Sequence, residues 1–332
     1  MHDLAFPLLV ALVAMALAFD FLNGLHDAAN SIATVVSTQL LSPVMAVAFA
    51  AVGNFLAYWI VGLHVAETVG SGIIDKDVVT PSVVFGALGG AMVWNVLTWI
   101  KGLPSSSSHA LIGGLLGAGI AHSGFGAVES AGTSKTLIAI VLSPMIGFAI
   151  AMLLMLLTSV LFQRTSPSRA NRAFKGLHLV SAAAQSISHG GNDAQKTMGI
   201  IAVLLYSTGH LEGKFHVPEW VVLSCYAAMS LGTLSGGWRI IRTMGTRLTR
   251  LNHHSGFCAS TASSIVLFGA SAFGIPVSTT HAITGSVVGT GAARRSSAVR
   301  WSVASRVVVA WFVTIPASGA VAALFYGLTT LF

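Results

Sequence analysis

Residues 23–30 of this chain read NGLHDAAN, and residues 189–196 read HGGNDAQK, at an offset of 166 residues. A second pair has the same character: residues 102–110 read GLPSSSSHA, and residues 274–282 read GIPVSTTHA, at an offset of 172 residues. Each copy sets polar residues and helix breakers inside strongly apolar sequence. A repeated pair of broken, polar membrane segments indicates a secondary transporter whose binding site lies where the two repeats meet.

The composition excludes an ordinary soluble protein. Of the 332 residues, 54% are hydrophobic and only 8% are charged, whereas soluble domains carry about 25% charged residues. Apolar runs such as 44–62 and 137–162 are long enough to span a bilayer as helices, which takes about 20 residues. A transmembrane β-barrel would instead alternate apolar and polar residues along short segments. We therefore expect an all-α integral membrane protein.

The apolar segments divide into two repeats. We expect residues 1–162 to form the first repeat, 163–175 a basic cytoplasmic linker, and 176–332 the second repeat. Each repeat should contain two spanning segments, a re-entrant helical hairpin and a long helix, and this odd number of crossings inverts the second repeat. Full crossing by both hairpin arms would also invert it, but the arms look short. The expected segments are 4–38, 42–62, 82–121 and 136–162, then 176–206, 219–237, 256–292 and 303–331.

The positive charges predict the orientation in the membrane. Most of the 17 Lys and Arg residues fall in three segments that contain no Asp or Glu. Cytoplasmic loops of membrane proteins carry an excess of Lys and Arg, so we expect these segments in the cytoplasm and both termini outside. The net charge of +7 then requires no nucleic-acid partner. The residues are Arg164, Arg169, Arg172, Lys175, Arg239, Arg242, Arg247, Arg250, Arg294, Arg295, Arg300 and Arg306.

The two Ser/Thr-rich turns are candidate anion sites. Pro104 and Pro276 precede runs of Ser and Thr, which are preferred N-cap residues. Each run leads into a Gly-rich apolar helix, so each turn should be the N-terminus of a half-helix at membrane depth, where backbone N–H groups and the helix dipole attract an anion. Local capping explains one such turn, but two matched turns can converge on one tetrahedral oxyanion. The following glycines should allow close helix packing: Gly113, Gly117, Gly285 and Gly289.

Asp27 and Asp193 are candidate cation or proton sites. A charged side chain at the bilayer centre costs about 2.5–3.5 kcal/mol on insertion scales, so it is functional by default. Carboxylate and amide oxygens suit hard cations, and a carboxylate alone can carry a proton. The structural alternative is a carboxylate paired with a basic neighbour such as Lys196. The flanking amides are Asn23, Asn30, Asn192 and Gln195, and Asp20 is a weaker candidate one helical turn before Asn23.

Each repeated motif also contains histidine. His26 and His189 belong to the aspartate motifs, and His109 and His281 follow the Ser/Thr-rich turns. Any of them could titrate near neutral pH. For His109 and His281 we expect a structural role, in which the ring donates a hydrogen bond to a backbone carbonyl.

The motifs resemble those of the inorganic phosphate transporter (PiT) family, in particular the bacterial low-affinity phosphate permeases. Residues 23–30 look like the first family signature and residues 189–199 like the second, with Gly191 where the usual pattern has Ala. The resemblance implies two inverted repeats, re-entrant hairpins, a homodimer, and symport of phosphate with Na⁺ or H⁺. Many similar bacterial members couple to protons and carry phosphate as a neutral metal–phosphate complex.

The resemblance also assigns roles by position. No resident metal or cofactor is implied; the partners are inorganic phosphate and the lipid bilayer of the inner membrane. Ser106, Ser107, Ser108, Ser278, Thr279 and Thr280 would bind phosphate, helped by Asn30 and Gln195. Asp27 and Asp193, with Asn23 and Asn192, would bind the coupling cations or protons.

Two other functions remain open at this point, and one is excluded. A sulfate permease could use the same scaffold, and a passive anion channel could use the same turns without coupling. An intramembrane hydrolase is not indicated, because the adjacent Ser108 and His109 would diverge on a helix and the chain has no His-Glu-x-x-His or Gly-x-Ser-x-Gly pattern.

Overall fold

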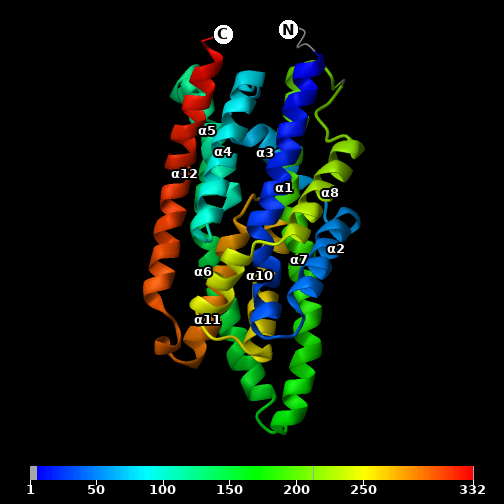
Figure 1. Cartoon of the computed structure of the whole chain (residues 1–332), viewed down its shortest axis with the longest axis vertical. Helices are drawn as coiled ribbons and strands as arrows, with labels where there is room; N and C mark the ends of the chain where they lie inside the picture. The colour runs from blue at the N-terminus through cyan, green and yellow to red at the C-terminus, as the bar shows by residue number, and fades with distance from the viewer. Residues whose placement is uncertain (1–5, 212, 332) are drawn as a thin grey trace.

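A computed structural model describes residues 6–211 and 213–331, which fold into a long bundle of helices (Figure 1). Short turns, including 3₁₀ segments and one π-helical segment, join the α-helices. Their bounds are α1 Phe6–Ser37, α2 Pro43–Ile60, α3 His64–Gly72, α4 Pro81–Lys101, α5 Ser107–Ser123, α6 Ser130–Leu161, α7 Pro167–Ser207, α8 Glu219–Ser235, α9 Trp238–Arg242, α10 His253–Ala272, α11 Thr279–Arg294 and α12 Trp301–Thr329.

Within the described ranges, six helices are long and apolar enough to cross a membrane, namely α1, α2, α4, α6, α10 and α12. The chain is therefore an all-α, multi-pass membrane protein, as its composition predicts. The helices that follow the Ser/Thr-rich turns are shorter: α5 has 17 residues and α11 has 16. At 1.5 Å per residue each is about 25 Å long, less than the roughly 30 Å of a hydrocarbon core.

The two helical hairpins approach each other from opposite ends of the bundle. The α4–α5 hairpin comes from the end where α1 begins and α12 ends, the α10–α11 hairpin comes from the other end, and their tips lie near mid-height (Figure 1). In each turn a glycine adopts a left-handed conformation, Gly102 with φ 62° and Gly274 with φ 61°, which glycine tolerates without a steric penalty. The two predicted helical hairpins are present, and their opposed approach is the arrangement expected of inverted repeats; that the hairpins are re-entrant in the membrane stays a prediction.

Each hairpin packs against the long helix of the other repeat. Helix α6 packs on α10 and α11, and α12 packs on α4 and α5. The predicted small-residue contacts lie at these crossings: a Cβ on Gly113 would be 2.5 Å from the Ile315 carbonyl oxygen, and a Cβ on Gly285 would be 2.2 Å from that of Pro144. Glycine therefore allows the backbones to touch, as predicted. The sequence does not predict that each long helix packs on the hairpin of the other repeat.

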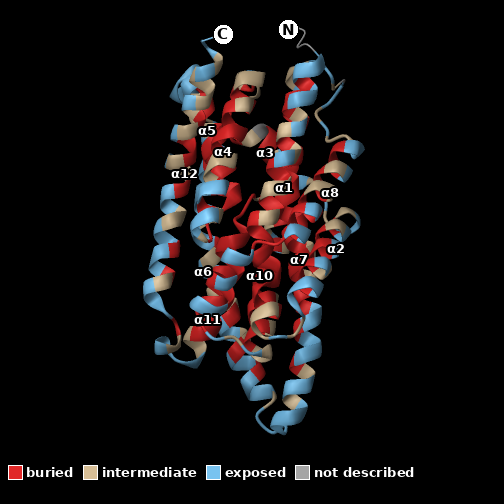
Figure 2. Ribbon diagram, in the orientation of Figure 1, coloured by how far each residue is buried: buried red, intermediate tan, exposed pale blue. Residues whose placement is uncertain are grey.

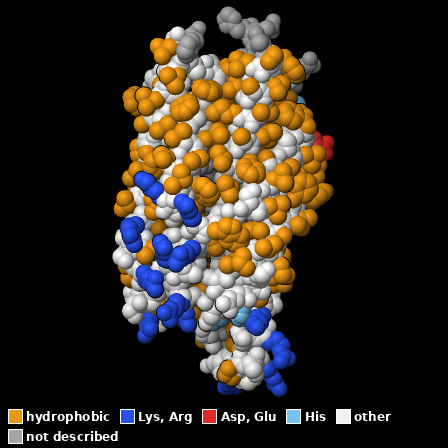
Figure 3. Space-filling view, in the orientation of Figure 1, with side chains coloured by type: hydrophobic (Ala, Val, Ile, Leu, Met, Phe, Trp, Pro, Cys, Tyr) orange, Lys and Arg blue, Asp and Glu red, His pale blue; other side chains and the backbone are white. Residues whose placement is uncertain are grey.

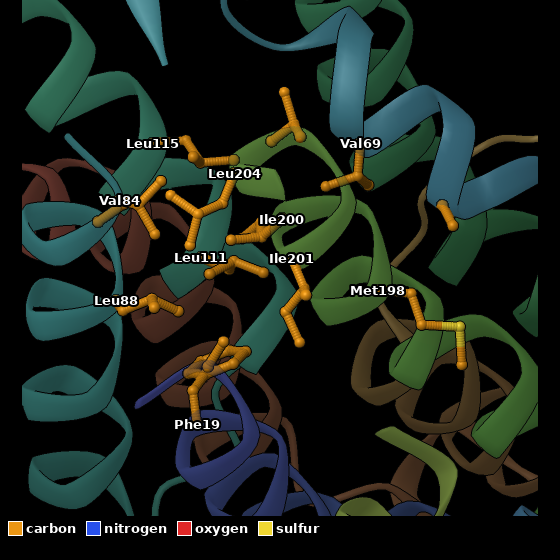
Figure 4. Close-up of a cluster of buried hydrophobic side chains, with 14 of the residues drawn as sticks. Phe19, Val69, Val84, Leu88, Leu111, Leu115, Met198, Ile200, Ile201 and Leu204 are labelled. Carbon is orange, nitrogen blue, oxygen red and sulfur yellow. The ribbon is translucent and has the colours of Figure 1, made fainter. Parts of the chain in front are cut away.

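The buried core encloses both aspartate motifs. Figure 2 shows the interior of the bundle as buried while its outer helix faces are exposed. Around the first hairpin, Phe19, Leu88, Leu111 and Ile200 belong to one apolar cluster built from α1, α4, α5 and α7 (Figure 4). The motif segments of α1 and α7 are thereby fixed between the hairpins, and residues 26–35 and 188–204 are buried throughout.

The largest departure from the expected segments concerns α7. This helix has 41 residues and begins at Pro167, so most of the expected linker 163–175 is helical. Proline is favoured in the first helical turn, and three of the four basic residues of the expected linker, Arg169, Arg172 and Lys175, lie on exposed positions of this helix. Helix α3 was not expected either. The division of the chain into two domains stays a prediction.

The positive charge gathers at one end of the molecule. In Figure 3 the Lys and Arg side chains of the visible face lie in its lower part, away from the end where α1 begins and α12 ends, and apolar side chains cover most of the upper part. The segments with predicted cytoplasmic location thus share one end of the bundle.

Candidate functional site

The two hairpin tips have the same local structure. Helix α5 starts at Ser107, and the hydroxyl oxygen of the N-cap residue Ser106 accepts a hydrogen bond of 3.2 Å from the His109 N–H. Helix α11 starts at Thr279, and the Ser278 hydroxyl accepts the same bond, also 3.2 Å, from the His281 N–H. The other N–H groups of a first turn have no intrahelical partner and carry partial positive charge. The predicted helix N-termini at the two turns are confirmed, and their depth in the membrane stays a prediction.

The tip hydroxyls donate to the two aspartates. Thr279 Oγ1 donates to Asp193 Oδ2 at 2.7 Å, and Ser108 Oγ donates to Asp193 Oδ1 at 3.4 Å. Thr280 Oγ1 lies 3.5 Å from Asp27 Oδ1, which accepts its hydrogen bond. Thus the second hairpin contacts the aspartates of both repeats, and both tips contact Asp193. The structure brings together two motif pairs that are far apart in the sequence.

The carboxylates lie close enough to share a ligand or a charge. Ligand atoms of Asp27, His189 and Asp193 are all within 4.8 Å of one another. His26 Nδ1 is 2.7 Å from Asp27 Oδ1, and His189 Nε2 is 3.4 Å from Asp193 Oδ2. Carboxylate and imidazole groups are established cation ligands, so this cluster can bind a small cation as well as exchange protons.

Three predicted amides of the aspartate motifs have unused acceptor atoms. Asn30 Nδ2 donates to Thr279 Oγ1 at 3.1 Å and Thr280 Oγ1 at 3.0 Å, while Asn192 Nδ2 donates to Ser271 Oγ at 3.2 Å. Among the described residues, the Oδ1 atoms of Asn23, Asn30 and Asn192 are buried and accept no hydrogen bond. A buried unpaired acceptor is costly, and amide carbonyl oxygens are ligands that hard cations prefer.

Gln195 is not part of this cluster, although the sequence places it among the phosphate ligands. Its Oε1 accepts hydrogen bonds from the N–H groups of Val65 at 3.0 Å and Ala66 at 3.2 Å, and its Nε2 donates to the Gly62 carbonyl at 2.7 Å. The side chain therefore caps the N-terminus of α3, a helix that the sequence pattern does not predict. That contact occupies both ends of the amide.

The hydrogen bonds of His26 and the contacts of Lys196 extend the site beyond the predicted residues. His26 Nε2 lies 3.0 Å from Thr98 Oγ1, and Ser105 Oγ donates to the same threonine at 2.9 Å. Ser107 Oγ lies 3.5 Å from His26 Nδ1. No sequence signal marks Thr98, which lies within the apolar run of α4. The sequence suggests Lys196 only as a neutralising partner of an aspartate, but its ammonium group contacts both hairpins.

The remaining motif histidines meet between the hairpins. The rings of His109 and His281 lie edge to face with centroids 4.3 Å apart. His281 Nδ1 lies 3.3 Å from the Ile140 carbonyl oxygen, as expected, and its ring stacks on Trp311 at 3.6 Å. The expectation for His109 was wrong, because its ring nitrogens have no hydrogen-bond partner in the described part of the chain. Asp20 is fully buried beside Asn23 and Thr197.

Comparison with known proteins points to one family. A family model described as the phosphate transporter family matches residues 23–170 and again residues 162–322. A protein of Rhizobium meliloti named a probable low-affinity inorganic phosphate transporter is 60% identical, with 97% of each chain covered. A protein of the same name from Bacillus subtilis is 41% identical, with 98% of each chain covered. A solved structure described as the sodium-dependent phosphate transporter has the same fold, with a TM-score of 0.89 at 24% identity over 98% of this chain and 100% of that one.

Proposed function

This chain belongs to the phosphate transporter family, and from that premise we propose that it imports inorganic phosphate by symport with Na⁺ or H⁺. The proposed substrate site consists of the two hairpin tips, with the hydroxyls of Ser107, Ser108, Thr279 and Thr280 and the amide of Asn30 as donors. Asp27 and Asp193, together with the amide oxygens of Asn23 and Asn192, form the proposed coupling site.

The observation that carries this proposal is that the tip hydroxyls donate to the aspartates. Thr279, Thr280 and Ser108 each donate to Asp27 or Asp193. When phosphate takes these donors, the carboxylates lose the hydrogen bonds that stabilise their charge. A cation or proton at the carboxylates then offsets the lost stabilisation, so that anion and cation binding favour each other. This gives coupling a physical basis in one small cluster.

The same cluster favours phosphate over sulfate. Phosphate can donate a hydrogen bond at neutral pH, whereas sulfate only accepts. Asp27 and Asp193 place carboxylate acceptors within hydrogen-bond reach of the tip hydroxyls, so a bound anion lies next to acceptors. A protonated phosphate oxygen can satisfy such an acceptor, and a sulfate oxygen would leave it unpaired, which is costly in a buried site.

Coupling is also needed on energetic grounds. Moving one charge through 100 mV costs about 2.3 kcal/mol, so a divalent anion entering an interior-negative cell climbs roughly 4.6 kcal/mol. Co-transported cations offset that cost. We place the basic end of the bundle in the cytoplasm, in line with the charge bias of cytoplasmic loops, and propose the inner membrane and a homodimer as the setting.

Uptake into proteoliposomes tests the proposal. Wild type, Asp27→Asn and Asp193→Asn are compared for ³²P-phosphate uptake under a proton gradient alone, a sodium gradient alone, and each with or without Mg²⁺. We expect concentrative uptake driven by one gradient and abolished in both variants, because each substitution removes a buried carboxylate charge from the proposed site. Excess sulfate should not compete. A requirement for Mg²⁺ would identify a metal–phosphate complex as the transported species.

Two outcomes would overturn the proposal. Flux that only equilibrates phosphate across the vesicle membrane would favour a passive anion channel. Strong competition by sulfate would favour a sulfate permease on the same scaffold. Concentrative uptake that survives both substitutions would leave a phosphate carrier but remove the aspartates from its coupling site.

A further inference from the structure

Lys196 contributes a positive charge at the centre of the site. Its side chain is 2% exposed. The ammonium nitrogen lies 2.5 Å from Asp193 Oδ1, 2.5 Å from Ser108 Oγ and 2.8 Å from the Val277 carbonyl oxygen. A lysine ammonium has three protons to donate, and these three oxygens use all of them.

These three oxygens resemble the coordination shell of a bound cation. One is a carboxylate, one a hydroxyl and one a backbone carbonyl, which are the oxygen ligands that hard cations take. They come from three different elements: Asp193 from α7, Ser108 from the first hairpin, and Val277 from the second hairpin. The ammonium thus occupies the place at which a free cation would join both tips to the second aspartate.

The first repeat has no equivalent charge. Lys196 is three residues after Asp193, and the residue three after Asp27 is Asn30. Asn30 is neutral and donates to Thr279 and Thr280 rather than to Asp27. Within the described residues, the ion pairs at Asp27 and Asp193 differ accordingly: Asp27 pairs with the His26 ring, and Asp193 with Lys196 as well as the His189 ring.

We propose that Lys196 is a tethered cation that replaces a mobile coupling ion at Asp193, so that the mobile ion binds only at Asp27. This inference rests on the proposed symport, because it concerns how many cations accompany each phosphate. A tethered ammonium neutralises Asp193 and holds the tips together, as a bound cation would. It cannot be released on the other side of the membrane, so it contributes no driving force from the ion gradient.

The substitution Lys196→Asn tests the inference by giving the second repeat the residue of the first. Asp193, Ser108 and the Val277 carbonyl would then be free to bind a mobile cation. We expect one additional positive charge to move with each phosphate, and the Hill coefficient for the driving cation to rise from about 1 towards 2, one unit per added site. Lys196→Arg keeps the charge and should retain the wild-type number of charges per phosphate.

The number of charges moved with each phosphate is obtained from the membrane voltage at which net phosphate flux is zero. This voltage is measured in proteoliposomes with a fixed cation gradient and a fixed phosphate gradient. An unchanged count in a transporting Lys196→Asn variant would overturn the inference and leave phosphate symport intact. Failure of the wild type to concentrate phosphate would instead overturn the proposed function, so the two failures are distinguishable.

A binding measurement covers the case in which Lys196→Asn folds but does not transport. The melting temperature of each purified protein in nanodiscs is followed as Na⁺ replaces choline at constant ionic strength. A ligand that binds only the folded state stabilises it as its concentration rises. Lys196→Asn should gain a Na⁺-dependent increase that Lys196→Arg lacks. Equal Na⁺ responses in the two variants would count against a vacated cation site.

Discussion

The two hairpin turns have the same backbone but different surroundings. Around the first turn, Trp94 Nε1 donates to Thr314 Oγ1 at 3.1 Å and Trp311 Nε1 donates to the Pro104 carbonyl at 3.3 Å. At the offset of 172 residues, the residue matched to Trp94 is Val266, and the residue matched to Trp311 is Ala139. Both line an apolar cavity of about 270 Å³ beside the second turn.

This difference indicates which hairpin is easier to move. Side chains of α9 and the segment after it also hold the first turn, since Arg239 donates to the Ile100 carbonyl at 2.6 Å and Thr243 donates to that of Gly102 at 3.0 Å. The second turn faces the cavity on α6, and its carbonyls accept from two lysines, Lys196 at 2.8 Å on Val277 and Lys135 at 3.4 Å on Phe273. Regions with few packed contacts open more readily. We therefore expect the second hairpin to open first when phosphate enters.

The largest loss of stability should come from disrupting the glycine contacts with the long helices, which both hairpins have. Gly113→Leu and Gly285→Leu each place a side chain against a backbone carbonyl, with Cβ distances of 2.5 Å to Ile315 and 2.2 Å to Pro144. Overpacking usually costs about 1–3 kcal/mol, and we expect more than about 3 kcal/mol here because backbone must move. Little monodisperse protein should survive extraction, as gel filtration and thermal unfolding would show.

Gly269→Ala is the control for both substitutions. Gly269 lies on α10, and a Cβ there would meet no atom within 4 Å. The free energy of unfolding of this variant should rise by at most about 1 kcal/mol, because alanine has a higher helix propensity than glycine. A stable, monodisperse Gly285→Leu protein would show that the second hairpin can separate from α6 without loss of the fold.

The glycine contacts also show what the sequence can predict. Hydropathy and the repeated motifs predict the helices, the hairpins and the small-residue crossings, because these depend on local patterns. The exchange of α6 and α12 between the hairpins depends on tertiary packing between distant segments, which one sequence does not encode in a readable pattern. Gln195 illustrates the same limit: its amide looked like a site ligand, but it caps α3, whose packing was not predicted.

The second effect should come from Trp311→Ala, which would make the first hairpin resemble the second. The substitution removes the hydrogen bond to Pro104 and the ring stacked on His281 at 3.6 Å. Since the indole is only partly buried, we expect the free energy of unfolding to fall by about 2–3 kcal/mol. This is less than the roughly 3–5 kcal/mol that truncation of a fully buried Trp costs. Phe312→Ala changes a neighbouring side chain that is 72% exposed and should alter thermal stability little. Equal losses in the two variants would contradict a specific role for Trp311.

A smaller and opposite effect is expected for Ala139→Trp, which would make the second hairpin resemble the first. An indole at this position would enter the cavity beside Val266, and cavity filling commonly adds about 0.5–2 kcal/mol of stability. If the second hairpin must move for transport, uptake should become slower while the protein becomes more stable. Leu153→Trp, at a position 55% exposed on the same helix, adds the same ring outside the cavity and should leave both properties near wild type.

The smallest expected effect is a difference in amide hydrogen exchange between the two turns of the wild-type protein. Backbone N–H groups of residues 273–278 should exchange faster than those of residues 101–106, because three side-chain donors reach carbonyls at the first turn and two reach carbonyls at the second, which also borders the cavity. A tenfold difference in protection corresponds to about 1.4 kcal/mol, and we expect about that size from one hydrogen bond fewer at the second turn. Phosphate should reduce the difference if the tips close on it. Faster exchange in the first turn would contradict this prediction. It would indicate that the first hairpin, at which Trp94 and Trp311 form hydrogen bonds, opens first.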